Sequence, residues 1–469
     1  MRPQRPLFIC SAHPLRRRPL AAASATGLAV LTLLTPLALP AAARCVDEAR
    51  VESFAEATEP GAAPPADPRG SLQTLVRDAL ERSHQVGAAR LVAEAAQDDV
   101  AETRAGKGVQ ASLGAGLGPG GTQSLAGTET SALQVRASVT VGQLLYDGGR
   151  LDRLTDWRVQ LGESARQGHL TVREQLALNT VSLALERSRF RQHVVVYGQY
   201  VRKMGCLVEA LETIVRADRG RSSELVQARK SLQQAELSQA QAQSQVRQVE
   251  TRLRRLVGDG LPSVGGLPTV LLTVPALEAI VADVDRSSEI AALTAQAAAM
   301  DQYAQAVAAG SKPQVSWNMS GSQAVGAGGS RGNVRNGSYA VGLAVNVPLL
   351  NPGVAPASDA ARKRARAAEL QRAEALEQRR FRAAEVHEQT SASFDRARRV
   401  AAVLRDSEQV RNFTLQQWQQ LGKRSLFDVM GAEAEHYNLR INYVNALTDG
   451  QQLNANLLSL GRGVGEWLQ

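Results

Sequence analysis

Four segments of the chain alternate strictly between apolar and polar positions. In residues 109–117 and 133–141 the odd positions are apolar, while the even positions carry mostly glycine, serine or other polar residues. Residues 315–320 and 339–347 continue the same pattern in the second half of the chain. Alternation places one chemistry on each face of a β-strand. A tilted strand needs about 9–11 residues to cross a bilayer, so we predict four membrane-crossing strands.

The whole arrangement occurs twice in the sequence. Matching residues lie about 204 positions apart, and a spacing this long indicates a duplicated half rather than a solenoid repeat. Taken singly, each strand pair also fits a half-buried hairpin of a soluble protein, but four strands in matched positions favour the membrane. Leu72 and Leu277 are 205 residues apart, whereas the other matched residues are 204 apart, so one small insertion separates the copies. The residues 204 apart include Gly106 and Gly310, Gln110 and Gln314, Ser112 and Ser316, Val141 and Val345, Gly149 and Gly353, Glu224 and Asp428.

Long helices connect the predicted strands. Residues 152–217 and 355–421 contain almost no proline and little glycine, and a helix of about 66 residues spans roughly 100 Å. Shorter helical segments are about half as long, so two of them end to end match one long helix. An elongated tethering coiled coil is the alternative, and the strands argue against it. The shorter segments are 71–105, 223–257, 277–309 and 426–460.

These elements predict a mainly α fold with some β: an internally duplicated chain with a long α-helical barrel and four membrane strands. A four-stranded sheet in lipid leaves its edges unpaired, so closure requires a homo-oligomer. Three chains would give twelve strands, but the physical argument alone does not choose three over two or four. The predicted organisation is a signal peptide (1–43), an extended segment (44–70), two structural repeats (71–257 and 276–460), a linker (258–275) and a C-terminal tail (461–469).

The N-terminal residues have the order of a secretory signal peptide. Five arginines within residues 1–18 precede an apolar stretch at 20–39 and an alanine triplet at 41–43. A permanent N-terminal anchor is the alternative, but Pro36 and Pro40 favour cleavage. Arg44 precedes Cys45, where a lipid-attachment signal needs a small residue, so we do not expect lipidation.

Charge and candidate chemistry argue against an enzyme. Removing residues 1–43 takes away five arginines and no acid, which lowers the formal charge from +9 to +4. The basic cluster at 362–366 is followed by acids on the same helix, so we interpret it as a solvated helix face and expect no nucleic-acid partner. The six histidines are scattered and the cysteines lack metal-site spacing. We predict no catalytic residue, no metal and no cofactor.

Two motifs carry a family resemblance. Residues 143–149 read Gln-Leu-Leu-Tyr-Asp-Gly-Gly where a strand meets a long helix, and residues 422–429 read Gly-Lys-Arg-Ser-Leu-Phe-Asp-Val. With the duplication, they make residues 71–460 resemble the TolC family of outer-membrane factors. The first motif supplies the strand-to-helix candidates Tyr146, Asp147, Gly148 and Gly149.

The resemblance implies a homotrimer that completes a twelve-stranded β-barrel in the outer-membrane lipid of a Gram-negative bacterium. It also implies a long helical tunnel in the periplasm. Such proteins are passive ducts that dock with a periplasmic adaptor (membrane fusion) protein and an inner-membrane transporter, driven by ATP or by protons.

The exported substrate is open at this stage. Family members export small molecules or proteins, and the chain is also similar to components that export the toxin cyclolysin, so we predict type I protein (toxin) secretion. A multidrug efflux channel is the alternative. A non-channel periplasmic adaptor or structural tether is an alternative of another class, although adaptors lack membrane-crossing strands.

The resemblance also implies a periplasmic gate formed by two helix turns. The matching positions are Ser223 and Glu224 in the first half, with Arg424 and Asp428 in the second. The forked guanidinium of arginine can bridge a carboxylate and a hydroxyl, and symmetry would gather the Asp428 carboxylates around the pore axis. The family often has a second acid where this chain has Gly431, so we expect one acidic ring. Ordinary helix-turn charges are the alternative reading.

Overall fold

The computed structural model describes most of the chain after residue 66. The chain divides into two units, Met1–Arg50 and Val51–Gln469, and every described residue belongs to the second. The predicted signal peptide and most of the predicted 44–70 segment therefore lie outside the described residues. The described ranges are 67–123, 129–261, 266–327, 334–421 and 423–469.

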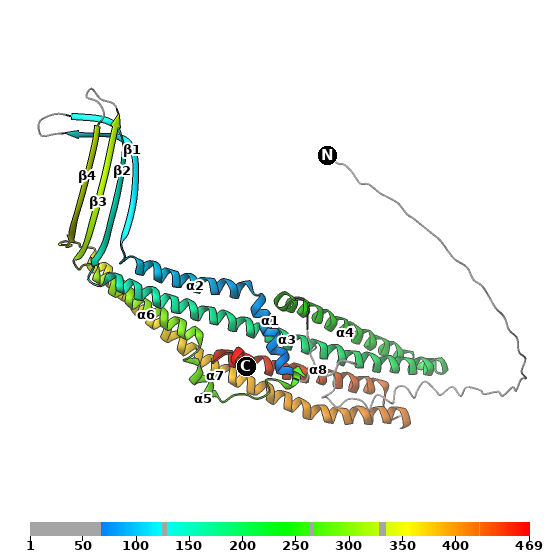
Figure 1. Ribbon diagram of the computed structural model, residues 1–469. Coiled ribbons are helices and arrows are strands. Elements are labelled where there is room, and N and C mark those ends of the chain that lie inside the picture. The colour runs from blue at the N-terminus through cyan, green and yellow to red at the C-terminus, as the bar shows by residue number, and fades with distance from the viewer. Residues whose placement is uncertain (1–66, 124–128, 262–265, 328–333, 422) are drawn as a thin grey trace, which may run out of the picture. The chain divides into compact units, whose positions relative to one another are not determined.

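Helices dominate the described residues, and four strands form one antiparallel sheet (Figure 1). This confirms the predicted mainly helical class with four strands. The order along the chain is α1 (Pro68–Arg82), α2 (His84–Ala105), β1 (Gln110–Gln123), β2 (Glu129–Tyr146), α3 (Arg150–Ala217), α4 (Ser222–Val257), α5 (Leu277–Val284), α6 (Ser288–Ala309), β3 (Gln314–Ala327), β4 (Val334–Asn346), α7 (Val354–Leu421), α8 (Leu426–Leu460) and α9 (Val464–Leu468).

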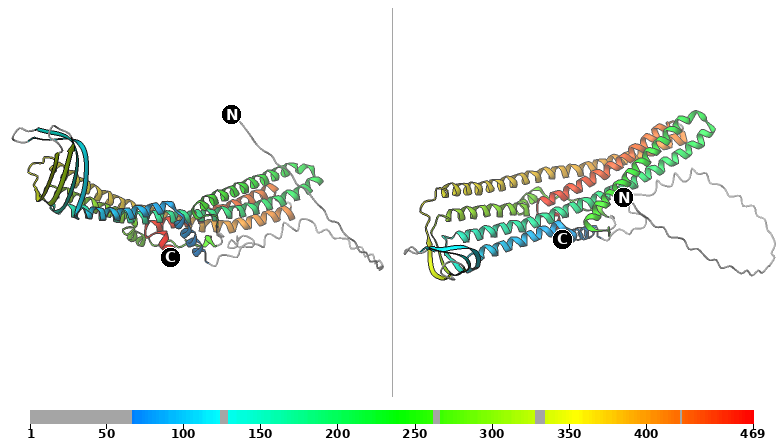
Figure 2. Two further views of the ribbon diagram at one scale, coloured as in Figure 1. Left: turned by 45° about the horizontal axis from the view of Figure 1, so that its top comes forward. Right: turned by 90° about the horizontal axis from the view of Figure 1, so that it is seen from above.

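Two helices of 68 residues each, α3 and α7, organise the helical part. Helix α3 packs against α2 and then α4, while α7 packs against α6 and then α8 (Figure 2). Small residues permit these close approaches: Ala304 of α6 packs with Ala361 and Ala365 of α7. Each long helix is thus matched by two shorter ones in succession, as the sequence predicts.

Two of the predicted shorter helices are interrupted. The segment 71–105 breaks at Ser83, whose hydroxyl accepts a hydrogen bond from the Val86 amide at 3.3 Å and caps α2. The segment 277–309 breaks just before α6, where Ser287 occupies the equivalent N-cap position. The prediction of one continuous helix in each place was therefore wrong. Serine favours helix N-caps over helix interiors, and the two serines lie 204 residues apart.

The sheet joins the two repeats, because the central strands β2 and β3 come from different halves. The strands follow the order β1-β2-β3-β4, which leaves β1 and β4 at the edges. Cross-strand partners share a face, so the register sorts the side chains by chemistry. One row of the first face is Leu113, Val139, Gly321 and Tyr339, and the neighbouring row of the opposite face is Ser112, Thr140, Ser320 and Ala340.

The first of these faces is apolar and open in the single chain. Leu113 is 79% exposed, Leu343 is 71% exposed and Tyr339 is 89% exposed. Exposed large apolar side chains on one continuous face indicate contact with lipid or protein. The opposite face consists mainly of serine, glycine, threonine and other small or polar residues. The predicted alternation thus appears as two chemically distinct faces.

The helical core includes the linker between the repeats. Two buried amides of α8 hold its backbone: Gln451 donates to the carbonyls of Leu267 and Val270 at 2.9 and 2.7 Å, and Asn454 donates to those of Leu271 and Thr273 at 2.7 and 2.9 Å. These bonds satisfy carbonyls of a segment that lies outside the strands and the longer helices, and the Leu267 carbonyl also accepts from the Val270 amide at 3.3 Å. The second part of the linker, residues 266–275, is therefore held against α8 as a fixed part of the fold.

The predicted C-terminal tail contains a helix. In α9, Val464 and Leu468 are buried in the same apolar cluster as α1 and α3. The carboxylate of Glu174 in α3 accepts hydrogen bonds from the amides of Val464 and Gly465 at the start of α9. Burial raises the pKa of Glu174, although these two amides act in the opposite direction.

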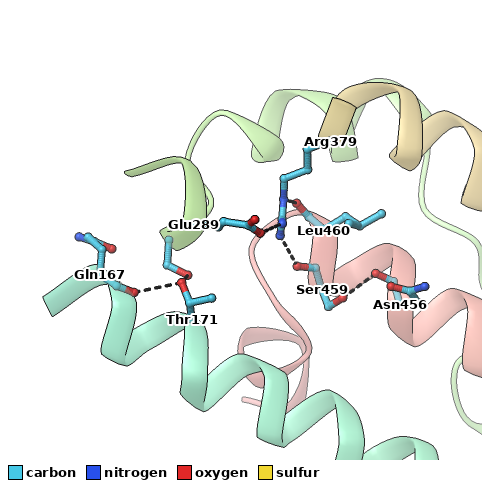
Figure 3. A network of polar contacts seen from close by, with 8 residues as sticks. Gln167, Thr171, Glu289, Arg379, Asn456, Ser459 and Leu460 are labelled. Carbon is cyan, nitrogen blue, oxygen red and sulfur yellow. Dashed lines mark hydrogen bonds and ion pairs between the residues drawn. The ribbon is translucent and has the colours of Figure 1, made fainter. Parts of the chain in front are cut away.

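A polar network joins α3, α6, α7 and α8 (Figure 3). Arg379 of α7 donates to the carbonyls of Leu460 and Ser459 at 2.9 and 3.0 Å, and it forms an ion pair with Glu289 of α6. These carbonyls belong to the last turn of α8, where no later helical residue supplies an amide to pair with them. The hydroxyl of Thr171 in α3 lies 3.2 Å from that of Ser288 at the start of α6.

Candidate functional site

The turn between β2 and α3 is built by the Tyr146–Gly149 motif. Asp147 is buried, and its two carboxylate oxygens accept hydrogen bonds from the amides of Gly149 at 3.0 Å and Leu151 at 2.6 Å. Gly149 holds the N-cap position of α3 in the left-handed region, at φ +82°. The carboxylate therefore satisfies amides that the first helical turn leaves unpaired.

Gly148 permits a close contact at this turn. Its φ is +69°, and a Cβ atom added there would lie 2.5 Å from the Cβ of Lys312. The ammonium of Lys312 donates to the Gly148 carbonyl at 3.1 Å. Tyr146, the last residue of β2, is about half exposed and follows an irregularity in the register of the strand. The motif fixes where the sheet meets the helices.

The second repeat keeps two hydrogen bonds of this turn, although Gly353 lacks the positive φ of Gly149. The side chain of Asn351 accepts from the Gly353 amide at 3.1 Å, as Asp147 does from Gly149. The backbone bond from Val354 to Asn351, at 3.2 Å, matches the bond from Arg150 to Asp147 at 3.3 Å. These residues are 204 apart, so the duplication extends to single hydrogen bonds.

The first predicted gate turn lies between α3 and α4. Ser223 is exposed in the first turn of α4, and Glu224 follows it with a side chain 16% exposed. The guanidinium of Arg221 lies 3.5 Å from the Glu224 carboxylate. A carboxylate in the first turn of a helix also interacts favourably with the helix dipole.

The second predicted gate turn lies between α7 and α8. Ser425 and Asp428 form a capping box: the Ser425 hydroxyl accepts from the Asp428 amide at 3.2 Å, and the Asp428 carboxylate accepts from the Ser425 amide at 3.1 Å. Arg424 is exposed and donates to the Gln417 side chain at 3.2 Å. The Ser-Leu-Phe-Asp run carries the signal for this capping box. This capping box was not among the features that we predicted from the sequence.

Apolar contacts join the two turns. An apolar cluster packs the ends of α3 and α4 against the first turn of α8. The polar candidates contact their own hairpins instead: Glu224 contacts Arg221, Arg424 contacts Gln417, and Asp428 contacts Ser425. The cluster comprises Met204, Leu207, Val208, Leu211, Ala228, Leu426, Val429 and Met430.

A buried charged group lies close to this cluster, one helical turn after Met430. Glu433 of α8 is fully buried, with the ammonium of Lys203 in α3 at 3.7 Å and the guanidinium of Arg411 in α7 at 3.8 Å. Burial raises the pKa of Glu433, although both cations act in the opposite direction. This group ties α8 to both long helices. The three residues are far apart in the sequence and each looks like an ordinary helix charge, so no local signal could have found it.

No helix among the described residues has both the length and the apolar character needed to cross a membrane. Within the same residues, no group of three or more histidine, cysteine, aspartate or glutamate side chains is arranged to hold a metal ion.

The family model for outer membrane efflux proteins matches residues 75–259. Solved structures of outer-membrane proteins share the fold of the chain. A structure of CusC, concerning folding and transmembrane channel formation, superposes with a TM-score of 0.72 at 17% identity and covers 87% of this chain and 96% of that one. The outer membrane protein VceC of Vibrio cholerae gives 0.71 at 18% identity, covering 84% and 97%. The open state of the MtrE channel of Neisseria gonorrhoeae gives 0.69 at 16% identity, covering 88% and 96%. No curated protein sequence matches the chain.

Proposed function

We propose that the chain is a member of the TolC family of outer-membrane factors and the passive exit channel of a tripartite export system; the match to the outer membrane efflux protein family over residues 75–259 supports this. The observation that carries this proposal is the sheet with one exposed apolar face and one polar face. Such a sheet suits a wall between lipid and water. The protein resides in the outer membrane, and its helical domain extends into the periplasm.

The open edges of the sheet support an oligomer. Strands β1 and β4 each lack a neighbour on one side within the described chain. Unpaired backbone groups in lipid cost several kcal/mol each, so the edges must pair with other copies. We propose a homotrimer with a twelve-stranded barrel. The mass of the purified complex, corrected for detergent, tests this, and a stable monomer in detergent-free buffer would contradict the proposal.

The helical part is proposed to dock with two partners. A periplasmic adaptor would contact the helical turns, and an inner-membrane transporter would supply the energy, because a passive duct has no energy source of its own. In-cell cross-linking from positions in the two turns, followed by identification of the captured protein, tests the contact. Cross-links to outer-membrane proteins alone would contradict it.

We propose that the exported cargo is protein, secreted by the type I route. A second candidate is the efflux of small molecules, which the description of the matching family model favours. Deleting the gene in its host separates the two. Loss of a secreted protein from the culture medium with unchanged drug susceptibility supports secretion, and the reverse result supports efflux.

We propose that Ser223, Glu224, Arg424 and Asp428 form the periplasmic gate. Arg424→Ser and Glu224→Ala each remove a polar contact at a turn, which costs on the order of 1 kcal/mol per chain. Three copies multiply this effect on a closed–open balance. We expect both variants to raise single-channel conductance. Unchanged conductance in both variants, with the trimer intact, would remove these residues from the gate.

Asp428 is proposed to line the narrowest part of the pore. Carboxylates are hard oxygen ligands, so three copies facing one axis would bind a trivalent cation and block the current. We expect Asp428→Asn to remove most of this block. The asparagine amide oxygen can still accept from the Ser425 amide, so the capping box remains closed. Equal block in the wild type and the variant would place the cation site elsewhere.

A further inference from the structure

The polar face of the sheet carries one kind of charge. On this face the described strand positions hold mostly glycine, serine, threonine, asparagine, glutamine and alanine, and Arg136 of β2 is the one ionised side chain among them. Its row across the sheet consists of Gly116, Arg136, Ala324 and Asn336. Both direct neighbours of Arg136 are therefore small.

Nothing in the described structure neutralises or covers this arginine. Arg136 is exposed, and no carboxylate in the described part of the chain pairs with it. A Cβ atom added at Gly116 or Gly118 would meet nothing within 4 Å, so no side chain lies across the glycines opposite it. The guanidinium therefore has open space beside it on the face that must be wet in a closed barrel.

We propose that Arg136 from three copies forms a cationic ring in the lumen of the barrel, and that this ring binds anionic groups of a passing solute. The inference rests on the proposed trimeric channel and adds a specificity-determining residue to it. Charges of one sign inside a pore with low-dielectric walls concentrate counter-ions. The planar fork of a guanidinium also matches the paired oxygens of carboxylate, phosphate and sulfonate.

Arg335 provides a matched control on the other face of the sheet. It lies on edge strand β4, in the row next to that of Arg136, where it pairs across the sheet with Val325. Its position belongs to the apolar face. Substituting either arginine with serine removes the same charge at nearly the same height in the barrel, so the two variants differ mainly in the face that they change.

The test measures how tightly pyrene tetrasulfonate binds to the purified protein in a neutral detergent at low salt. Fluorescence anisotropy of the pyrene reports the binding. We expect Arg136→Ser to weaken binding about tenfold, because hydrogen bonds to charged groups are lost from each copy. Arg136→Lys keeps the charge but loses the fork, so we expect an intermediate affinity. Arg335→Ser should bind as the wild type does. Rising salt should weaken the wild type most, since exposed charges are screened.

The possible results separate this inference from the proposed function. Equal affinity of the wild type and Arg136→Ser, with both trimeric, would overturn the cationic ring and leave the channel intact. An equal loss in Arg335→Ser would also overturn it, because the effect would then not depend on the face. A wild-type protein that is not trimeric would instead contradict the proposed function.

Discussion

Single residues at the β2–α3 turn decide how the sheet meets the helices. Gly148 and Gly149 are consecutive, and both adopt positive φ values that side chains rarely tolerate. Their surroundings differ: a Cβ atom at Gly148 would overlap Lys312, whereas a Cβ atom at Gly149 would meet nothing within 4 Å. The pair therefore separates backbone strain from steric overlap.

We predict that Gly148→Ala destabilises the protein more than Gly149→Ala. Both changes force alanine into the left-handed region at a cost of about 1–2 kcal/mol. Gly148→Ala adds the overlap with Lys312, which costs about 1–3 kcal/mol more when a packed site has to shift. Thermal unfolding of the detergent-purified variants, followed by circular dichroism, compares them. Equal melting temperatures would show that Lys312 moves away freely.

At the scale of elements, buried titratable groups lie between the long helices. Burial lowers the pKa of His193 in α3 to about 4 and that of His436 in α8 to about 3. Both histidines are therefore neutral in the folded protein at neutral pH. In the unfolded chain, a histidine takes up its proton near pH 6.5. Acid therefore favours the unfolded chain.

The sign of the pH dependence follows from these values. The stability from the two neutral histidines is complete above about pH 6.5. It is lost at about 1.4 kcal/mol per pH unit for each group, as the pH falls toward 4 for His193 and toward 3 for His436. Glu433 acts in the opposite direction. Its raised pKa makes the folded state lose stability as the pH rises above the ordinary value of 4.5.

We predict that the two histidines remove on the order of 2–4 kcal/mol of stability per chain from the wild type between pH 6.5 and pH 5, partly offset by Glu433. The double variant His193→Gln and His436→Gln should show a shallower loss. His84 is exposed, so His84→Gln serves as the control and should follow the wild type. Guanidinium denaturation midpoints at the two pH values measure the effect. If the stability of the double variant falls between the two pH values as steeply as that of the wild type, these histidines are not the source of the pH dependence.

At the scale of the whole molecule, the two faces of the sheet differ in chemistry and therefore suit different surroundings, lipid on one side and water on the other. Val341 and Ala340 are neighbours on edge strand β4 and belong to opposite faces, Val341 to the apolar one and Ala340 to the polar one. Both are exposed in the single chain. Only the environment on each face distinguishes a charge placed at one position from a charge placed at the other.

We predict that Val341→Arg prevents membrane assembly while Ala340→Arg permits it. Arginine facing lipid near the middle of a bilayer costs about 2–4 kcal/mol, whereas a lumenal position is solvated. Outer-membrane fractionation and the yield of detergent-stable trimer report assembly. Equal yields from the two variants would contradict the assignment of the apolar face to lipid.

The sequence by itself determined the repeating parts of this protein. Residues 109–117 reveal a strand because alternation is a local property, and the long helices are visible because proline and glycine are scarce within them. Because the chain is duplicated, each type of element could be predicted from two separate segments of the sequence. The serines at the N-cap positions, Ser83 and Ser287, were also visible in the sequence, but a helix-friendly composition around them hid the two breaks.

Only the tertiary structure decided which side chains meet. The contact of Glu433 with Lys203 and Arg411 depends on how three helices pack, and none of these residues differs locally from a solvent-facing helix charge. The same holds for Asn454, whose amide binds linker carbonyls more than 180 residues away in the chain. Periodicity fixes the buried face of an element, whereas the partner of a buried polar group depends on distance in space, which sequence separation does not encode.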